Sequence, residues 1–251
     1  MRKEPQIIVA ASPTGDAYRD DNAEALKPLL PYVSGVKVGI GTLFAPDPTA
    51  KRFVSAAAYR YGLKVLLDAK LDDIGNTTAK ALMLLLDEYR GTSMITVHGS
   101  MSEASLRFVV EICGERGVTP VAIGLLSDVS EKECIALHGA SPNIYMRRIM
   151  ERAWECGLRN LVTSVRELKF LRRSEIGKQM TMIAVAVQPS WFPANDQVRT
   201  GTPVEAAQDG ADYVVVGRPI MWPPSEIGGR VEAAQRIKAE ISDACSIAIS
   251  A

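Results

Sequence analysis

The sequence predicts an α/β protein with a single domain, residues 1–251, folded as a (β/α)8 TIM barrel. Eight short apolar runs recur along the chain, and their mean spacing of about thirty residues suits a repeated strand–helix unit. The runs are apolar on both faces, as expected of parallel strands covered by helices, and amphipathic segments separate them. An open, doubly wound sheet also alternates strands with helices and is the alternative architecture.

The predicted elements alternate along the whole chain. The eight predicted strands are 6–11, 35–39, 64–69, 94–99, 119–126, 160–164, 181–187 and 212–217. The amphipathic segments that predict helices are 21–30, 77–91, 102–117 and 228–244. Asn76 or Thr77 is placed to cap the second of these helices at its amino end, and Gly91 is placed to cap its carboxyl end.

Charge and hydropathy exclude several classes of partner. Lys plus Arg and Asp plus Glu both number 29, so no basic surplus predicts a nucleic acid or an anionic membrane surface as partner. The basic run 168–173 is expected to form the solvated face of a helix. No apolar run approaches the ~20 residues of a membrane span, and the apolar stretch near the amino terminus is too short for a signal peptide.

The four cysteines lie far apart and form no C-x-x-C pair, and the chain has only two histidines. This pattern predicts no zinc site. It favours reduced thiols in a cytoplasmic protein.

The third predicted strand carries charges where a core is expected, in the stretch LLDAKLDDIGNTTAK (66–80). Asp68 and Lys70 are two residues apart, so both point the same way, into the mouth of a barrel. Asp73 follows in the loop, and Lys37 lies inside the apolar run GVKVG. Because an unpaired buried charge costs several kcal/mol, we expect an alternating array of Lys37, Asp68, Lys70 and Asp73.

Two other interpretations of these charges remain open. They could form an ion-pair network that only stabilises the strand end, and such a network also perturbs pKa values. Asp68 and Asp73 could instead bind a metal ion, although Lys70 between them would repel a cation. Two long segments, 127–143 and 188–203, follow the fifth and seventh strands. In a barrel they would lie at the carboxyl end of the strands, where active sites are built.

These motifs resemble the orotidine 5′-phosphate decarboxylase family. The pattern D-x-K-x-x-D followed by I-x-N-T (68–77) comes after a lysine in a V-K-V-G setting, and TVHG (96–99) is similar to the fourth strand of the family. LLSDVS (125–130) is similar to the end of its fifth strand, and NDQVRTGTPVEAAQDGADYVVVGRPI (195–220) to its phosphate-binding end. The likeness runs in order from Ile7 to Ile220. D-x-K-x-x-D alone is shared with related sugar-phosphate enzymes.

The resemblance implies a cofactor-free and metal-free decarboxylation of orotidine 5′-phosphate (OMP) to uridine 5′-phosphate (UMP) and carbon dioxide, in de novo pyrimidine biosynthesis. It assigns Lys70 the stabilisation and protonation of the carbanion at C6 of the pyrimidine, and places Asp68 beside the departing carboxylate. Lys37 and Asp73 would hold the array and contact the ribose. Asp73 and Thr77 would reach the site of a neighbouring subunit, so the resemblance implies a homodimer.

The resemblance also implies the substrate-binding residues. Gly217 and Arg218 would bind the phosphate, Gln197 would lie in a loop that closes over it, and Ile74 is the first residue of I-x-N-T. Ser127 and Ser130 lie where the family touches the pyrimidine, although helix capping explains them equally well. For His98, at the end of the fourth strand, we expect a hydrogen-bonded core histidine without a catalytic role.

The chain departs from the family pattern at several positions. Ser12 stands where the family usually has a ribose-binding aspartate; Ala186 stands for a glycine and Gln188 for a phosphate-binding arginine. Trp191 and Phe192 lie in a loop that is usually small and polar. These departures leave substrate affinity and the exact substrate open.

Two alternative functions follow. One is a metal-dependent lyase of the superfamily, of the hexulose-phosphate synthase or keto-gulonate-phosphate decarboxylase type, which usually has A-G where this chain has Ile74 and Gly75. The other is a non-catalytic barrel that binds a phosphate ligand. The intact lysines and aspartates argue against a binder, whereas Ser12 and Gln188 argue for it.

Overall fold

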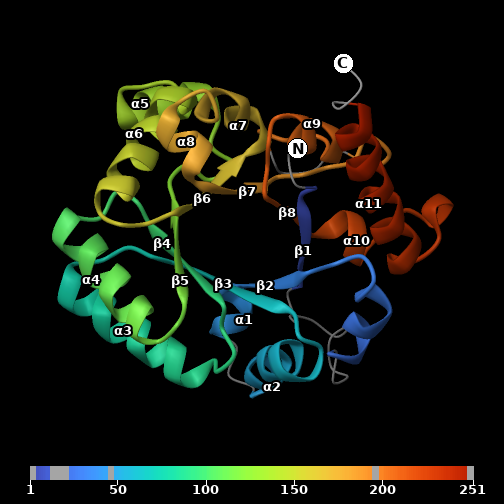
Figure 1. The fold of residues 1–251 in the computed structure, drawn as a ribbon, viewed down its shortest axis with the longest axis horizontal. Helices are drawn as coiled ribbons and strands as arrows, with labels where there is room; N and C mark the ends of the chain where they lie inside the picture. The colour runs from blue at the N-terminus through green and yellow to red at the C-terminus, as the bar shows by residue number, and fades with distance from the viewer. Residues whose placement is uncertain (1–3, 12–22, 45–47, 194–197, 248–251) are drawn as a thin grey trace.

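The computed structural model describes residues 4–11, 23–44, 48–193 and 198–247. Eight parallel strands close into a barrel in chain order, with β8 pairing β1, and helices form a ring outside it (Figure 1). This confirms the predicted (β/α)8 barrel and excludes the open sheet. The strands are β1 Gln6–Ala10, β2 Gly35–Gly39, β3 Lys64–Leu71, β4 Met94–His98, β5 Thr119–Ile123, β6 Asn160–Ser164, β7 Thr181–Val185 and β8 Tyr213–Val216.

The helices that connect the strands vary widely in length. The α-helices are α1 Ile40–Leu43, α2 Thr49–Ser55, α3 Gly75–Glu88, α4 Glu103–Glu115, α5 Glu131–His138, α6 Pro142–Glu155, α7 Val165–Leu171, α8 Glu175–Gln179, α9 Pro203–Gln208, α10 Arg218–Met221 and α11 Arg230–Ile247. Two 3₁₀ helices, η2 (Glu24–Leu29) and η4 (Ser225–Ile227), and a π-helix, η3 (Ala56–Arg60), complete the described elements.

Two apolar layers hold the barrel together. The larger layer lies between the outer faces of the strands and the helices. A smaller cluster is formed by residues from β1, β3, β4, β5, β7 and β8, and its buried members are Ile8, Leu66, Met94, Val121, Ile183 and Val215. Because side chains alternate along a strand, Asp68 lies on the same side of β3 as Leu66. The apolar filling therefore supports the charged residues at the carboxyl ends of the strands.

Some predicted helix ends were wrong. Helix α3 begins at Gly75, so Asn76 and Thr77 lie in its first turn, and no side chain caps it. It ends at Glu88 with Tyr89 as cap, and Gly91 follows with a φ of 95°. The segment 21–30 was predicted as a helix; within its described part, η2 is a 3₁₀ helix with Pro28 inside it. Proline lacks the N–H that an α-helix needs.

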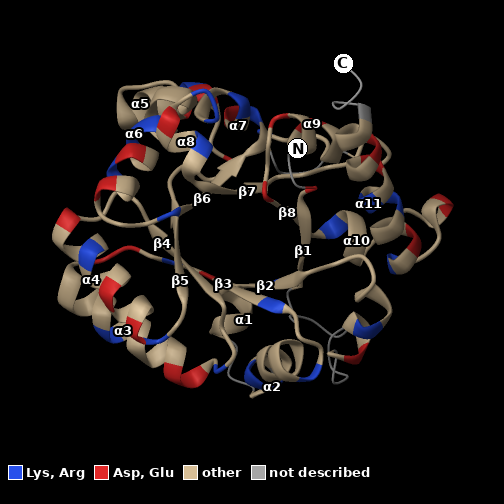
Figure 2. Ribbon diagram, in the orientation of Figure 1, with Lys and Arg blue, Asp and Glu red and all other residues tan. Residues whose placement is uncertain are grey.

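Charged residues lie mainly on the outer helices (Figure 2). The basic run 168–173 was expected to form the solvated face of a helix, but the Arg172 side chain is only 12% exposed and pairs with Asp212 at 2.5 Å. Its guanidinium also donates to the carbonyls of Gly177, Met180 and Gly210, at the amino end of the barrel. In the described part of the chain, no helix is both long and apolar enough to cross a membrane.

Candidate active site

The end of β3 is bent at Lys70. The pairing of β3 with β4 shifts register between Leu67 and Leu71, and Lys70 has a φ of 48°. This left-handed conformation costs an L-residue roughly 1–2 kcal/mol and is typical of functional positions. The Lys70 amide donates to Thr96 Oγ1 at 2.9 Å, which compensates for part of the lost strand pairing. The bulge therefore positions the Lys70 side chain at the carboxyl end of the barrel.

Two lysines share one carboxylate oxygen. Lys37 Nζ lies 2.9 Å and Lys70 Nζ 2.6 Å from Asp68 Oδ2, and Thr96 Oγ1 donates to Asp68 Oδ1 at 3.1 Å. We call Lys37, Asp68 and Lys70 the cavity cluster. Burial alone would raise the pKa of Asp68, but the two ammonium groups outweigh it, so this pKa lies below the usual value. The cluster thus carries two cations and one anion, an excess of one positive charge.

The cavity cluster opens into a cavity of about 310 Å³ at the carboxyl ends of the strands, a size that suits a small ligand. Ser127 lines the cavity after β5, Gln188 after β7, and Gly217 and Arg218 after β8. The apolar lining comes from the barrel interior and includes Ala10, Leu66, Ile123, Val162, Val185 and Val215. Polar groups at the rim over an apolar floor fit a ligand that combines an apolar part with charged groups.

Four predicted site residues in the described part of the chain lie outside this cavity: Asp73, Ile74, Thr77 and Ser130. Asp73, Ile74 and Thr77 are exposed on the loop after β3 and the first turn of α3. Asp73 Oδ1 accepts a hydrogen bond from the Ile74 amide at 2.7 Å. The cluster therefore contains three members of the predicted four-residue array, because the chain turns outward before it reaches Asp73.

Ser130 is the N-cap of α5 and forms a capping box with Glu133. Its contacts therefore match the helix-capping interpretation. His98 is hydrogen-bonded through both ring nitrogens, as expected, to Ser100 Oγ at 2.5 Å and to the Gly124 carbonyl at 2.9 Å, but its side chain is 21% exposed and lies at the edge of the core. The predicted positions Ser12 and Gln197 lie outside the described residues.

Ala186 and Gln188, the two positions after β7 that differ from the family pattern, each have a distinct conformation or set of contacts in the structure. Ala186 has a φ of 57°, a conformation that glycine adopts without strain. The Gln188 amide group donates to the Pro193 carbonyl at 2.5 Å, and the Gln188 backbone N–H donates to the Gly201 carbonyl at 2.8 Å. The indole of Trp191 donates to Glu240 on α11 at 2.8 Å. Trp191 thus anchors the start of the loop to the outer helix ring.

Sequence reasoning missed several residues of this region. Thr96 holds both the Lys70 amide and Asp68, and its place two residues after the inward-facing Met94 could have identified it. Trp222, half exposed at the cavity rim, follows the G-R-P motif without a signal of its own. Arg199 and Glu167 form a buried ion pair behind the cavity wall, although 32 residues separate them in the sequence.

The metal interpretation of Asp68 and Asp73 finds no support in this geometry, because Asp68 is bonded to two ammonium groups and Asp73 lies outside the cavity cluster. Among the described residues, no three His, Cys, Asp or Glu side chains are grouped as a metal site.

Comparisons with known proteins identify relatives of this chain. A family model described as "Orotidine 5′-phosphate decarboxylase / HUMPS family" matches residues 5–226. The orotidine 5′-phosphate decarboxylase of Frankia casuarinae is 32% identical over 81% of this chain and 79% of that protein. The enzyme of the same name from Paramagnetospirillum magneticum is 30% identical over 94% of this chain and 97% of that protein.

A solved structure shows the same fold. The uncharacterized conserved protein from Geobacillus kaustophilus superposes with a TM-score of 0.70 and covers 94% of this chain and 99% of its own. Its sequence identity is 22%, so this likeness concerns the fold alone.

Proposed function

The chain belongs to the orotidine 5′-phosphate decarboxylase / HUMPS family, and from this premise we propose that it decarboxylates OMP to UMP and carbon dioxide. The reaction is a step of de novo pyrimidine biosynthesis. One observation carries the proposal above all: Lys70, on a strained backbone, and Lys37 share the carboxylate of Asp68 at the mouth of the cavity.

In the proposed mechanism, the bond between C6 and the carboxylate carbon breaks and its electron pair stays on C6. The ammonium of Lys70 stabilises this developing carbanion, because a fixed charge in a partly buried site needs no reorganisation during the reaction. A proton then passes from Lys70 Nζ to C6, and the amine regains a proton from solvent. No other atom of the pyrimidine ring has to change.

Asp68 serves this mechanism in two ways. It holds both ammonium groups in place before substrate binds, at 2.6 and 2.9 Å. Its lowered pKa keeps it ionised at neutral pH, so it disfavours the substrate carboxylate beside it more than the carbanion that follows. Lys37 bonds the same oxygen of Asp68 as Lys70 does, and we assign it a contact with the ribose.

The remaining contacts bind the parts of the substrate that do not react. We assign the phosphate to Arg218, whose guanidinium offers two parallel donors, and to the Gly217 backbone, Gln188 and Gln197. Ser127 contacts the pyrimidine, and Ser12 a ribose hydroxyl. Binding energy from the phosphate can thereby fix the reacting end of the molecule.

We further propose that the active enzyme is a homodimer, in which Asp73 and Thr77 complete the site of the neighbouring subunit. Their exposure supports this assignment, as does Ile74 between them, which is 73% exposed. A partner surface would cover this apolar side chain. We place the enzyme in the cytoplasm, which agrees with its four unpaired cysteines.

The decisive test is the ultraviolet absorbance change when OMP is added to the purified protein in the presence of EDTA. Rapid loss of substrate by the wild type, and not by Lys70→Ala, is the expected result. Folded wild-type protein without turnover would refute the proposed reaction. Sugar phosphates with added magnesium would then test the alternative, a metal-dependent lyase.

The subunit arrangement is tested separately by mixing two inactive variants, Lys70→Ala and Asp73→Ala, under conditions that exchange subunits. A hybrid dimer has one intact site if Asp73 acts across the interface, so random exchange should restore about a quarter of wild-type activity. No recovery, with exchange verified by mass spectrometry, would show that Asp73 does not act in this way.

A further inference from the structure

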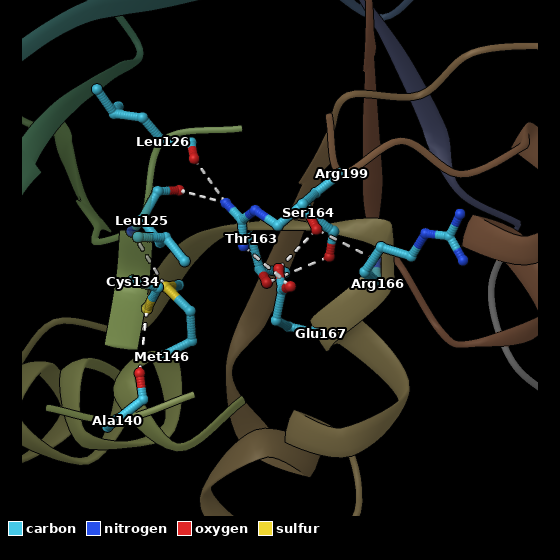
Figure 3. Close-up of polar contacts among 10 residues, drawn as sticks. All are labelled: Leu125, Leu126, Cys134, Ala140, Met146, Thr163, Ser164, Arg166, Glu167 and Arg199. Carbon is cyan, nitrogen blue, oxygen red and sulfur yellow. Dashed lines mark hydrogen bonds and ion pairs between the residues drawn. The ribbon is translucent and has the colours of Figure 1, made fainter. Parts of the chain in front are cut away.

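A buried ion pair lies behind the cavity wall, between the loops that follow β5 and β7. Arg199 Nη1 is 3.0 Å from Glu167 Oε1, and the two side chains are 8% and 4% exposed. Glu167 also accepts a hydrogen bond from Ser164 Oγ at 2.6 Å, at the end of β6. Figure 3 shows the arginine reaching from its loop toward Glu167 on one side and toward Leu125 and Leu126 on the other.

The other end of the guanidinium holds the loop after β5. Arg199 Nη2 donates to the Leu126 carbonyl at 2.6 Å and to the Leu125 carbonyl at 3.3 Å. The backbone amides of Val198 and Arg199 both donate to the Ser127 carbonyl at 3.2 Å. The side chain of Arg199 therefore holds Leu125 and Leu126 and its main chain holds Ser127, and all three of these residues line the cavity.

The loop after β7 is closed on itself at the same place. Val187 pairs with Gly201, and the backbone N–H of Gln188 donates to the Gly201 carbonyl at 2.8 Å. The chain thus leaves the barrel at Gln188, which lines the cavity, and returns at Arg199. Arg199, together with the backbone amide of Val198, fixes the returning end of this loop to the wall made by residues 125–127.

We propose that Arg199 is a positioning residue that sets the distance between these two loops, and hence the fit of the cavity to the pyrimidine and the phosphate together. The inference rests on the proposed function. A buried ion pair adds little stability over apolar side chains of similar volume, so stability alone does not account for it. A planar guanidinium can bind a carboxylate and two carbonyls at fixed angles, which a single ammonium cannot do.

The test compares steady-state kinetics of the double variant Glu167→Leu/Arg199→Met with the wild type. The double variant removes both charges together and leaves no unpaired ion in the core. We expect its KM for OMP to rise about tenfold or more and its kcat to change less than about threefold, because the lost fit affects substrate and transition state alike. Arg199→Lys, which keeps the charge but not the carbonyl contacts, should also raise KM.

Arg172→Met provides a matched control. Arg172 is also largely buried, pairs with an aspartate and donates to backbone carbonyls, but it lies at the amino end of the barrel. Its loss should lower the thermal midpoint and leave KM and kcat unchanged. Wild-type KM in both Arg199 variants would overturn the proposal. Failure of both to fold would also overturn it, because the pair would then serve the fold itself.

Calorimetric titration with UMP separates this inference from the proposed reaction. Wild-type protein that binds UMP but does not turn over OMP would refute the reaction. A Kd for UMP raised about tenfold in the double variant would still support the positioning role, and an unchanged Kd would contradict it.

Discussion

In the described part of the chain, two ionic groups near the carboxyl ends of the strands, one partly buried and one almost fully buried, differ in charge balance. The cavity cluster has two lysines for one aspartate, and its side chains are 12–31% exposed. The Arg199–Glu167 pair has one cation for one anion, and its side chains are 4–8% exposed. The first opens into the cavity, whereas the second lies behind the cavity wall.

The difference in net charge suits the two groups to different roles, one in ligand binding and one in internal structure. A balanced pair needs no counter-charge from outside the protein; Arg199 Nη2 meets two backbone carbonyls, and within this pair only Arg199 Nε finds no hydrogen-bond partner among the described residues. A cluster with an excess positive charge beside a cavity is completed only by an anion, and the carboxylate of OMP or the carbanion derived from it would provide that charge. Charge balance therefore distinguishes the group that acts on the substrate from the group that positions its surroundings.

The largest expected effect is that of Lys70→Ala on turnover. Removal of both the electrostatic stabilisation and the proton donor should lower kcat at least about 10⁴-fold, while the far-ultraviolet circular dichroism stays that of the folded barrel. Lys64→Ala is the matched control, because Lys64 begins the same strand and bonds Tyr213 at the opposite end of the barrel. Equal losses of kcat in the two variants would show that the effect does not depend on the position of the lysine at the carboxyl end of the barrel.

The second prediction concerns stability. Here a substitution in the Arg199–Glu167 pair should have a larger effect than a substitution in the cavity cluster. Glu167→Met leaves Arg199 buried without its carboxylate, and the free energy of unfolding should fall by about 3–5 kcal/mol. Lys37→Met leaves Asp68 paired with Lys70 in a partly open site, so the loss should be only about 1 kcal/mol. Urea denaturation of both variants measures this difference. A larger loss for Lys37→Met would contradict the comparison.

The sequence predicted one of these groups and missed the other for physical reasons. Lys37, Asp68 and Lys70 lie inside apolar strands, where charges are conspicuous, and strand alternation places them on one face. Glu167 lies in the first turn of α7, three residues after the N-cap Ser164, so its spacing resembles that of an exposed capping acid. Its partner lies on a loop, and nothing local indicates that the two meet.

The fold was more predictable than the details of the site. All eight strands were identified because each is a short apolar run at a regular interval. The bend at Lys70 was not, because a φ of 48° depends on the contact of its amide with Thr96, on the neighbouring strand. The outward turn before Asp73 likewise depends on where β3 ends, and element ends are the least predictable feature of a sequence.

The third prediction concerns pH and Asp68. Its pKa is lowered in the folded protein, so the folded state binds a proton more weakly than the unfolded state. The stabilisation by the carboxylate is therefore fully present above the unfolded pKa and lost as pH falls through the lower folded pKa. The difference in unfolding free energy between wild type and Asp68→Asn should be constant above about pH 5 and shrink below about pH 4. A difference that grows at acidic pH would show the opposite shift.

The smallest expected effect concerns backbone strain. Strained residues occur in the cavity lining, whereas Arg199 and Glu167 are not among the residues with positive φ. Among the described residues, the non-glycine positions with positive φ are Lys70 and Ala186, and both line the cavity. Lys70 must keep its side chain, but Ala186→Gly removes the left-handed penalty of about 1–2 kcal/mol and adds an entropic cost of about 0.5–1 kcal/mol.

A net gain of about 0.5 kcal/mol in the free energy of unfolding should follow for Ala186→Gly, with kcat unchanged because Lys70 and Asp68 are not touched. Thermal unfolding in parallel with the OMP assay would measure both quantities. A loss of stability would mean that the methyl group of Ala186 packs usefully against the loop after β7, so that the strain at this position has a compensating contact. The strained backbone at Ala186 would then be offset by packing, whereas the strained backbone at Lys70 would serve to position a reactive side chain.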